Sequence, residues 1–160
     1  MKALGLLLLV GGLSLAQPTV PRPAPRINFL EDCRGKVTVL AFIVTSCPHC
    51  QAFSKVLEDL SRTHKSICAR EAAFNDDADI TAFARNLQIT FPVLKIERGV
   101  MNDFMGVPRG SRVGTPQIAV IDRAGTIQAQ SAREGSPFLM QAEILTAIVE
   151  DLSKQRLSQQ

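Results

Sequence analysis

The chain lacks the large charge excess of nucleic-acid-binding proteins and the clustered ligands of zinc proteins. It has 160 residues, four cysteines, two histidines and a formal net charge of +3. The basic residues are spread along the chain, so no nucleic-acid partner is expected. A zinc site at Cys47 and Cys50 would need two more ligands at close spacing, but Cys33, Cys68 and His64 are scattered. We therefore expect no metal site and no bound cofactor.

The chain also lacks internal repeats, and its longest apolar run is too short to span a membrane readily. Its apolar residues 3–15 follow Met1-Lys2 and end in Ser14-Leu15-Ala16, which satisfies the small-residue cleavage rule. We predict that residues 1–16 are a secretory signal peptide, with an uncleaved membrane anchor as the alternative. No cysteine lies near the cleavage point, so a lipoprotein anchor is not expected. Removing 16 residues would leave 144, a length suited to one domain.

What is present centres on a buried strand followed by a helix. Residues 37–44 are almost continuously apolar, which is typical of a parallel strand covered on both faces. From residue 50 onward, apolar positions recur with helical spacing while charged residues occupy the other face. Cys47-Pro48-His49-Cys50 therefore stands where a strand ends and an amphipathic helix begins.

A helix start gives these cysteines a chemical role. Cys47 falls at the N-cap, and Pro48 falls at the first helical position, where its missing N–H costs nothing. Free N–H groups and the helix dipole favour a thiolate at Cys47, and the thiolate is the form that attacks disulfides. Cys50, one turn later, can resolve the mixed disulfide that results. His49 adds a cation that would tune the redox potential. An inert structural disulfide is the alternative.

The rest of the chain alternates between predicted strands and helices. Residues 17–26 form a proline-rich linker, residues 27–154 the domain and residues 155–160 a tail. We predict an edge strand at 27–30, strands at 67–74, 117–121 and 126–132, helices at 80–87 and 100–105, and a final helix capped by Ser136 and started by Pro137. We assign four phenylalanines to the core: Phe53, Phe83, Phe91 and Phe138.

In their order along the chain, five motifs resemble thioredoxin-fold proteins. They are Gly35-Lys36-Val37, Ser46-Cys-Pro-His-Cys50, Phe91-Pro-Val, Gly114-Thr-Pro116 and Ile121-Asp-Arg-Ala-Gly125. The chain is most similar to exported bacterial thiol-disulfide oxidoreductases of the TlpA/ResA-like group, from about residue 25 to residue 152. The Cys-Pro-His-Cys centre is also that of the DsbA oxidants, whose large helical insertion has no room here. The resemblance implies an α/β fold with a central mixed sheet flanked by helices on both faces.

The resemblance also implies that Pro116 is a cis proline that holds Thr115 beside the sulfurs, where its backbone can pair with an extended substrate. Without the resemblance, Pro116 could equally be trans. Two positions depart from the family. Ala41 stands where thioredoxins have a buried aspartate, and Ser46 replaces the usual aromatic residue. Glu71 or Asp76 could supply a substitute base, although solvated carboxylates at the end of a strand are the simpler expectation.

Cys33 and Cys68 form a second pair of interest. In this fold the strand before Cys47 and the strand after the first helix are parallel neighbours, so residues near their starts approach each other. We predict a structural Cys33–Cys68 disulfide at the end of the sheet opposite Cys47. Two unbonded thiols, with Cys68 half-buried, are the alternative.

The expected activity is therefore disulfide exchange with exported client proteins, through Cys47 and Cys50. Because of the predicted signal peptide, we expect an extracytoplasmic protein. We also expect a monomer that depends on a separate protein as electron donor or acceptor. Two other functions are considered. One is a non-catalytic module that binds copper or an apo-cytochrome through the cysteines and His49 or His64. The other is a peroxiredoxin-like peroxidase, which would usually carry threonine at the position of Val44.

Overall fold

The computed structural model describes residues 17–155, which form a six-stranded sheet with helices against it. The predicted signal peptide and residues 156–160 of the predicted tail lie outside the described residues. Among residues 17–155, no helix is both long enough and apolar enough to cross a membrane. The elements in chain order are β1 (Arg22–Pro23), η1 (Asn28–Cys33), β2 (Thr38–Ile43), α1 (Pro48–Thr63), β3 (Cys68–Ala73), α2 (Ile80–Leu87), β4 (Val93–Lys95), α3 (Arg98–Met105), β5 (Gln117–Ile121), β6 (Thr126–Gln130) and α4 (Ala142–Lys154).

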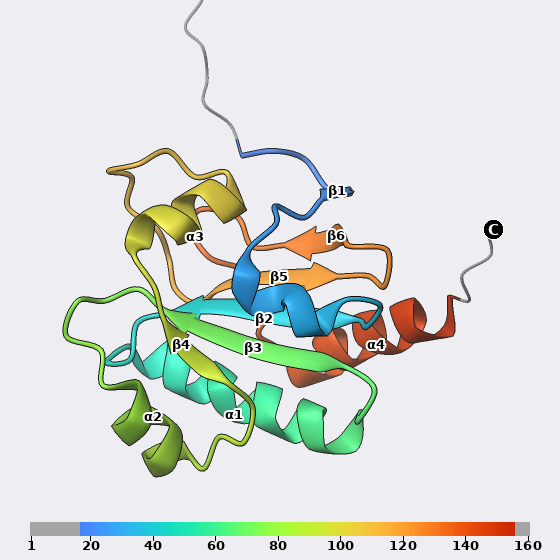
Figure 1. The fold of residues 1–160 in the computed structure, drawn as a ribbon, viewed down its shortest axis with the longest axis horizontal. Coiled ribbons are helices and arrows are strands. Elements are labelled where there is room, and N and C mark those ends of the chain that lie inside the picture. Colours follow the sequence, from blue (N-terminus) through green and yellow to red (C-terminus); the bar gives the residue numbers. More distant parts are fainter. Residues whose placement is uncertain (1–16, 156–160) are drawn as a thin grey trace, which may run out of the picture.

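The sheet has the strand order β1-β6-β5-β2-β3-β4 (Figure 1). Its central strand β2 is buried along its whole length, as its continuous apolar sequence predicts. β2 runs parallel to β3 and antiparallel to β5, and β5 and β6 form the antiparallel hairpin expected near the end of the chain. The sheet is therefore mixed.

Helices cover both faces of this sheet. One apolar cluster joins β2, β3 and β5 to α1, α2 and α4, and includes Cys50 and Phe53. The other cluster joins the opposite face to α3 and the segment around η1, and includes Phe42 and Phe104. In Figure 1, η1 lies in front of the sheet and α4 behind it. The layered arrangement predicted from the sequence is present.

Three local predictions were wrong. Residues 28–33 form a 3-10 helix instead of an edge strand, and the edge strand is β1, which pairs with β6. The final helix starts at Ala142, not at Pro137. Ser136 and Pro137 belong to a separate turn before it, in which the Ser136 hydroxyl accepts a hydrogen bond from the Leu139 N–H. Phe138 lies in that turn and is 58% exposed, so it is not a core residue. The other three phenylalanines pack against the core cluster, two of them buried and Phe91 partly so.

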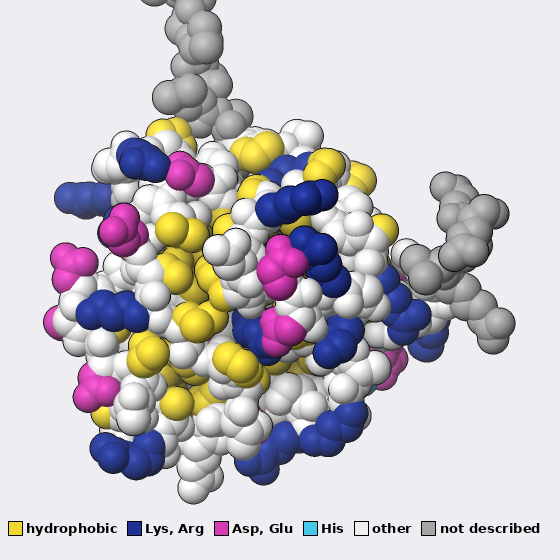
Figure 2. All heavy atoms as spheres, viewed as in Figure 1, with side chains coloured by type: hydrophobic (Ala, Val, Ile, Leu, Met, Phe, Trp, Pro, Cys, Tyr) yellow, Lys and Arg dark blue, Asp and Glu magenta, His cyan; other side chains and the backbone are white. Residues whose placement is uncertain are grey.

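Charged side chains cover the surface without separating by sign. Figure 2 shows Lys and Arg spread over one face and interspersed with Asp and Glu. Several of these residues pair locally, as Arg109 does with Asp103 at 2.8 Å and Arg133 with Glu134 at 2.8 Å. Pairs this exposed contribute little to stability.

Candidate active site: two cysteines at the start of a helix

The Cys47–Cys50 segment links the end of β2 to the start of α1. Cys47 is the N-cap of α1 and has extended backbone angles, and Pro48 occupies the first turn, as predicted. The preceding loop is held in place because the Asn75 side chain accepts from the Thr45 N–H at 3.0 Å and donates to the Thr45 hydroxyl at 2.9 Å. Gln51 donates to the Thr45 carbonyl at 3.0 Å. The position of Cys47 is thus fixed from both sides of the turn.

The two sulfurs differ in their exposure to solvent. Both cysteines are free thiols; Cys47 is half-buried, whereas Cys50 is 0% exposed. The Sγ of Cys50 lies below the end of β2, where it accepts a hydrogen bond from the Val44 N–H at 3.4 Å. A client sulfur can therefore reach Cys47 from solvent, while Cys50 can be reached only from within the protein.

The environment also separates the acidities of the two thiols. Burial raises the pKa of Cys47, but the Thr115 hydroxyl and the backbone and side chain of Cys50 favour its thiolate more strongly. The net result is a pKa for Cys47 below the ordinary cysteine value. Burial raises the pKa of Cys50 to about 12. Cys47 is the sulfur suited to attack a disulfide, whereas Cys50 is a protonated thiol near neutral pH.

A proline loop faces Cys47. The Thr115–Pro116 bond is cis, in agreement with the expectation from sequence. The Thr115 hydroxyl donates to Cys47 Sγ at 3.4 Å, and Cys47 Sγ lies 3.9 Å from the Thr115 carbonyl oxygen. The Thr115 backbone was expected beside the sulfurs, but its hydroxyl contact was not predicted. Its position directly before a cis proline could have indicated that contact. Close packing with the loop after β6 holds this segment, because a side chain at Gly114 would overlap the Glu134 carbonyl.

Pro48 and His49, assigned to tuning the potential, are both exposed at the start of α1. His49 follows Cys47 by two residues in the chain. A hollow of about 390 Å³ lies beside the pair, between the loop before α1 and helix α2. It is lined by Thr45, Ser46, Gln51, Asp77, Asp79, Phe83, Asn86 and Leu87.

One expectation about carboxylates needs correction. Asp76 is exposed, but Glu71 is 0% exposed in the middle of β3 and is not a solvated residue at the end of a strand. Its Oε1 lies 2.7 Å from the Ser54 hydroxyl of α1. The register of β3 could have revealed this contact, since Glu71 lies opposite Ala41 on β2.

Cys33 and Cys68 form a disulfide, as predicted, and their Cα atoms are 5.4 Å apart. Cys68 begins β3 and is paired in register with Thr38 at the start of β2, so the disulfide lies at the end of the sheet remote from Cys47. It connects η1 to the sheet.

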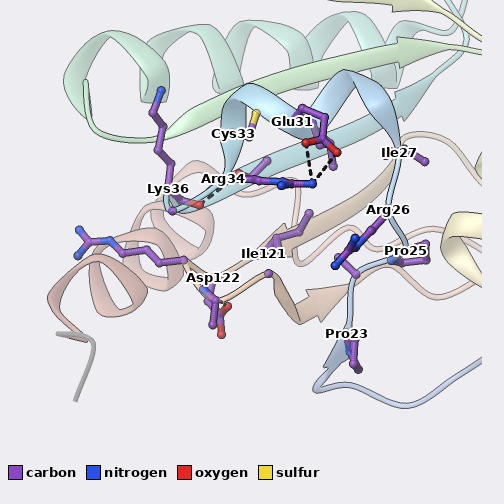
Figure 3. Close-up of a pocket in the computed structure, with 17 residues that line it drawn as sticks. Pro23, Pro25, Arg26, Ile27, Glu31, Cys33, Arg34, Lys36, Ile121 and Asp122 are labelled. Atoms are coloured by element: carbon purple, nitrogen blue, oxygen red, sulfur yellow. Dashed lines mark hydrogen bonds and ion pairs between the residues drawn. The ribbon is translucent and has the colours of Figure 1, made fainter. Parts of the chain in front are cut away.

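A cavity of about 520 Å³ lies at the same end, between η1 and the β5–β6 turn (Figure 3). Arg34 pairs there with Glu31 at 2.6 Å, while Arg26 and Lys36 do not converge with them on a common point. The larger of the two hollows is therefore far from the free thiols. We assign the chemistry to the thiols, because cavity size carries no reactivity.

Metal ligands do not assemble in the described part of the chain. No group of three or more His, Cys, Asp or Glu side chains there is placed to hold a metal ion. His64 instead lies 3.4 Å from Glu150 of α4, away from the cysteine pair. Within residues 17–155, the thiols are the reactive groups that the fold brings together.

Known proteins share features of this chain. A family profile described as the AhpC/TSA family matches residues 24–130. The "Thioredoxin-like protein YneN" of Bacillus subtilis (strain 168) is 27% identical over 104 residues, which cover 62% of this chain. The match spans 58% of the length of that relative.

Solved structures share the fold. A thioredoxin-family thiol:disulfide interchange protein from Chlorobium tepidum has a TM-score of 0.67 at 20% identity, covering 84% of this chain and 98% of its own. A secreted Mycobacterium tuberculosis disulfide oxidoreductase, described as homologous to E. coli DsbE, has a TM-score of 0.59 at 20% identity, covering 75% and 84%. The fold is therefore the thioredoxin-like α/β fold expected from the sequence. The family profile matches well over half of the chain's length, and the chain therefore belongs to the AhpC/TSA family.

Proposed function

We propose that the protein is a thiol-disulfide oxidoreductase that exchanges disulfides with client proteins through Cys47 and Cys50. The observation that carries this proposal is the asymmetry of the pair. A half-exposed sulfur with a lowered pKa stands at the start of α1, and a buried thiol with a raised pKa lies one turn behind it. Thiol exchange needs this division between an attacking and a resolving sulfur.

The reaction begins when the Cys47 thiolate attacks one sulfur of a client disulfide. A bond forms between Cys47 and that sulfur, and the second client sulfur leaves with the electron pair and takes up a proton. Cys50 then loses its proton and attacks Cys47. The Cys47–Cys50 bond forms, and the first client sulfur leaves as a thiolate. Two electrons pass to the client; the reverse sequence oxidises a client dithiol.

The cis-proline loop would position the client. Thr115 presents its carbonyl next to Cys47, so an extended client segment could pair with the main chain there. His49 and Pro48, which follow Cys47 at the exposed start of α1, would set the redox potential. A Cys-Pro-His-Cys centre of the DsbA type is part of this proposal. The thiols themselves carry the electrons, so the proposed reaction uses no cofactor.

We assign the reaction to an extracytoplasmic compartment, where a disulfide such as Cys33–Cys68 persists. The M. tuberculosis structural neighbour is described as secreted, which supports this location. The protein would act as a monomer and would receive or pass on its electrons through a separate redox protein. Residues 1–16 would serve as its export signal.

The test compares wild type with Cys47→Ser and Cys50→Ser in insulin reduction and in oxidation of a dithiol peptide. Cys47→Ser should abolish turnover, since it removes the attacking sulfur. Cys50→Ser should stop after the first step and accumulate a mixed disulfide that mass spectrometry detects on Cys47. Full activity in Cys47→Ser would refute the proposal.

The same proteins separate the two alternatives. A peroxiredoxin-like enzyme would turn over hydrogen peroxide with Cys47, although Val44 supplies no hydroxyl three residues before it. A copper-binding module would retain stoichiometric cuprous ion after dialysis and show no disulfide exchange. Peroxide turnover that is faster than exchange, or retention of copper without exchange, would each replace the proposed function.

A further inference from the structure

Glu71 is a buried acid that the exchange mechanism described above leaves unused. It lies in the middle of β3, is 0% exposed, and has its Oε1 within 2.7 Å of the Ser54 hydroxyl. Its other oxygen, Oε2, is buried and has no hydrogen-bond partner. A buried, half-satisfied carboxyl is costly to keep, so its retention calls for an explanation.

The sheet places this carboxyl in the same layer as Cys50. Glu71 is paired in register with Ala41 of β2 and with Val93 of β4, neither of which titrates. Ala41 and Cys50 belong to the apolar cluster between the sheet and α1, and Glu71 reaches Ser54 of α1 in that layer. The carboxyl absent at Ala41 is therefore present one strand away, on the same face.

Ser54 connects the carboxyl to Cys50. Its hydroxyl lies 2.9 Å from the Cys50 carbonyl oxygen as well as 2.7 Å from Glu71 Oε1. A hydroxyl has one proton to donate, so both contacts are satisfied when Ser54 donates to the carbonyl and a protonated Glu71 donates to Ser54. The geometry thus favours a neutral Glu71 while both cysteines are thiols.

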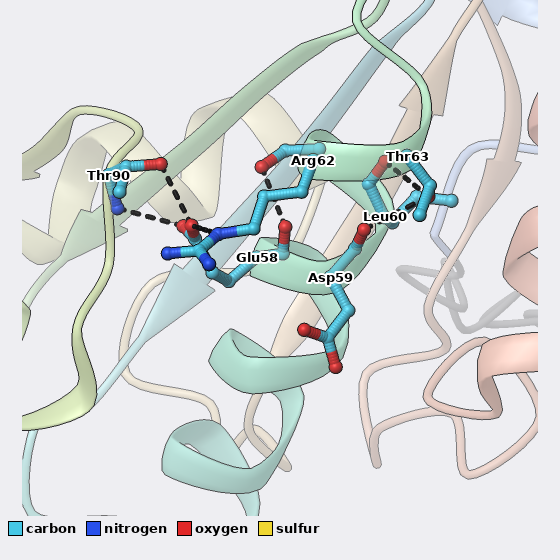
Figure 4. Close-up of polar contacts among 7 residues, drawn as sticks. Glu58, Asp59, Leu60, Arg62, Thr63 and Thr90 are labelled. Carbon is cyan, nitrogen blue, oxygen red and sulfur yellow. Dashed lines mark hydrogen bonds and ion pairs between the residues drawn. The ribbon is translucent and has the colours of Figure 1, made fainter.

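The other ionisable groups on α1 and β3 near this layer have partners elsewhere and do not contact Glu71. Glu58, one turn beyond Ser54, is turned away to Arg62 at 2.6 Å and to the Thr90 N–H and hydroxyl at 2.8 Å each (Figure 4). Arg70, the neighbour of Glu71 on β3, pairs with Asp32. Cys47 is turned toward Thr115. Cys50 is the remaining titratable group that α1 presents to this layer.

We propose that Glu71, held by Ser54 in the layer that contains Cys50, is the buried acid that exchanges a proton with Cys50 in the second step of disulfide exchange. This inference rests on the proposed function. When Cys50 attacks Cys47, its sulfur loses a proton, which Glu71 takes up in the fraction of molecules where it is ionised. The Cys47–Cys50 bond forms, the Cys47–client bond breaks, and the client sulfur leaves with the electron pair. In the reverse direction Cys50 leaves with the electron pair and receives that proton back. Glu71 does not touch the client; its proposed role is to take up and return the proton of Cys50.

The acidities agree with this role. Burial raises the pKa of Glu71 to about 8, and burial raises the pKa of Cys50 to about 12. Glu71 remains the stronger acid of the two, so it can protonate a departing Cys50 thiolate. Its pKa also lies close to neutral pH, where an acid-base group works best in both directions.

The experiment mixes the reduced protein with 5,5′-dithiobis(2-nitrobenzoate) and follows the coloured thiolate by stopped flow from pH 6 to pH 9.5. The first phase reports attack by Cys47. The second reports displacement of the bound aromatic thiol by Cys50. Four proteins are compared: wild type, Glu71→Gln, Ser54→Ala and, as the matched control, Glu58→Gln. Glu58 is also a buried glutamate, but its contacts are to Arg62 and Thr90.

In wild type and Glu58→Gln, the second-phase rate should rise with a midpoint near pH 8, the pKa of Glu71. In Glu71→Gln this rise should be lost, and the second phase should be roughly a hundredfold slower above pH 8, the low end of acid-base contributions. Ser54→Ala should lose the same rise, and it carries the test if Glu71→Gln does not fold. The first phase should be the same in all four proteins.

A second phase in Glu71→Gln or folded Ser54→Ala with the wild-type pH dependence would overturn the role of Glu71 and leave the proposed function intact. Absence of the first phase in wild type would instead refute the proposed function. A purely structural role for Glu71 would slow both phases or lower stability, without removing the inflection near pH 8.

Discussion

The sulfurs of Cys47 and Cys50 differ because of a few individual contacts. Cys47 stands at the helix start and accepts from the Thr115 hydroxyl at 3.4 Å, while Cys50 is sealed beneath the end of β2. A hydrogen bond to a charged group is worth more than one to a neutral group, so the Thr115 hydroxyl stabilises the thiolate more than the thiol. The acidity of Cys47 therefore depends on a side chain remote from it in sequence.

Thr115→Val tests this dependence, because valine keeps the branched shape and removes the donor. The pKa of Cys47 should rise, and its alkylation by iodoacetamide at pH 7 should slow by roughly three- to tenfold. The measurement is the pH dependence of alkylation, followed by mass spectrometry. Thr63→Val at the end of α1, where the hydroxyl contacts the Asp59 and Leu60 carbonyls and the His64 ring, serves as the control and should match wild type. An unchanged profile in Thr115→Val would show that the helix start alone sets the acidity.

At the scale of elements, the Cys33–Cys68 disulfide joins η1 to the start of β3 across a sequence separation of 35 residues. Closing a loop of this length restricts the unfolded chain and contributes about 4 kcal/mol in the chain-entropy description. The double variant Cys33→Ala/Cys68→Ala should lose about that much in its free energy of unfolding, measured with urea. Its first-phase reactivity at Cys47 should be unchanged, because the disulfide lies at the other end of the sheet.

Cys47→Ala is the control for this measurement. It removes a half-buried thiol without opening the loop, so its free energy of unfolding should stay within about 0.5 kcal/mol of wild type. Equal stability of the double variant and wild type would mean that the bond does not constrain the chain.

The same scale shows which elements could be predicted from the sequence. β2 appears where its continuous apolar run indicated it, and α1 and α2 appear where their helical apolar spacing indicated them. β3 lies within the range predicted for it, 67–74. The segment around Phe29 failed because its alternating apolar residues suit either a short strand or one face of a 3-10 helix. The start of α4 failed because Ser136 and Pro137 imitate a helix cap while forming a separate turn.

At the scale of the whole molecule, the site is an assembly of segments far apart in the chain. Cys47 meets Thr115, and Ser54 meets Glu71, across separations that local patterns do not encode. The cysteines and Pro116 could be selected from the sequence because their motifs occur in a recognisable order. Glu71 could not, since its burial depends on the register between β2 and β3 and on the packing of α1 over both.

The burial of Glu71 should appear in the pH dependence of global stability. Its pKa is about 8 in the folded protein, compared with about 4.5 when unfolded. Between these pH values the folded state keeps a proton that the unfolded state has lost, so the free energy of unfolding falls as the pH rises. The loss is complete above about pH 8 and amounts to roughly 5 kcal/mol at most. Glu71→Gln should remove this decline, which urea unfolding at pH 5 and pH 8 measures.

Glu58→Gln is again the matched control, and its sign is opposite. Burial opposes ionisation of Glu58, but the Thr90 N–H and Arg62 outweigh it and hold its pKa below the ordinary value. The stability that Glu58 contributes is fully present above the unfolded pKa of about 4.5 and is lost as the pH falls through the folded pKa. Glu58 therefore changes the free energy of unfolding only below about pH 4.5. The difference in stability between pH 5 and pH 8 should therefore match wild type in Glu58→Gln and shrink in Glu71→Gln. Equal differences in all three proteins would mean that Glu71 is already ionised in the folded state at pH 5, which would contradict a pKa raised by burial.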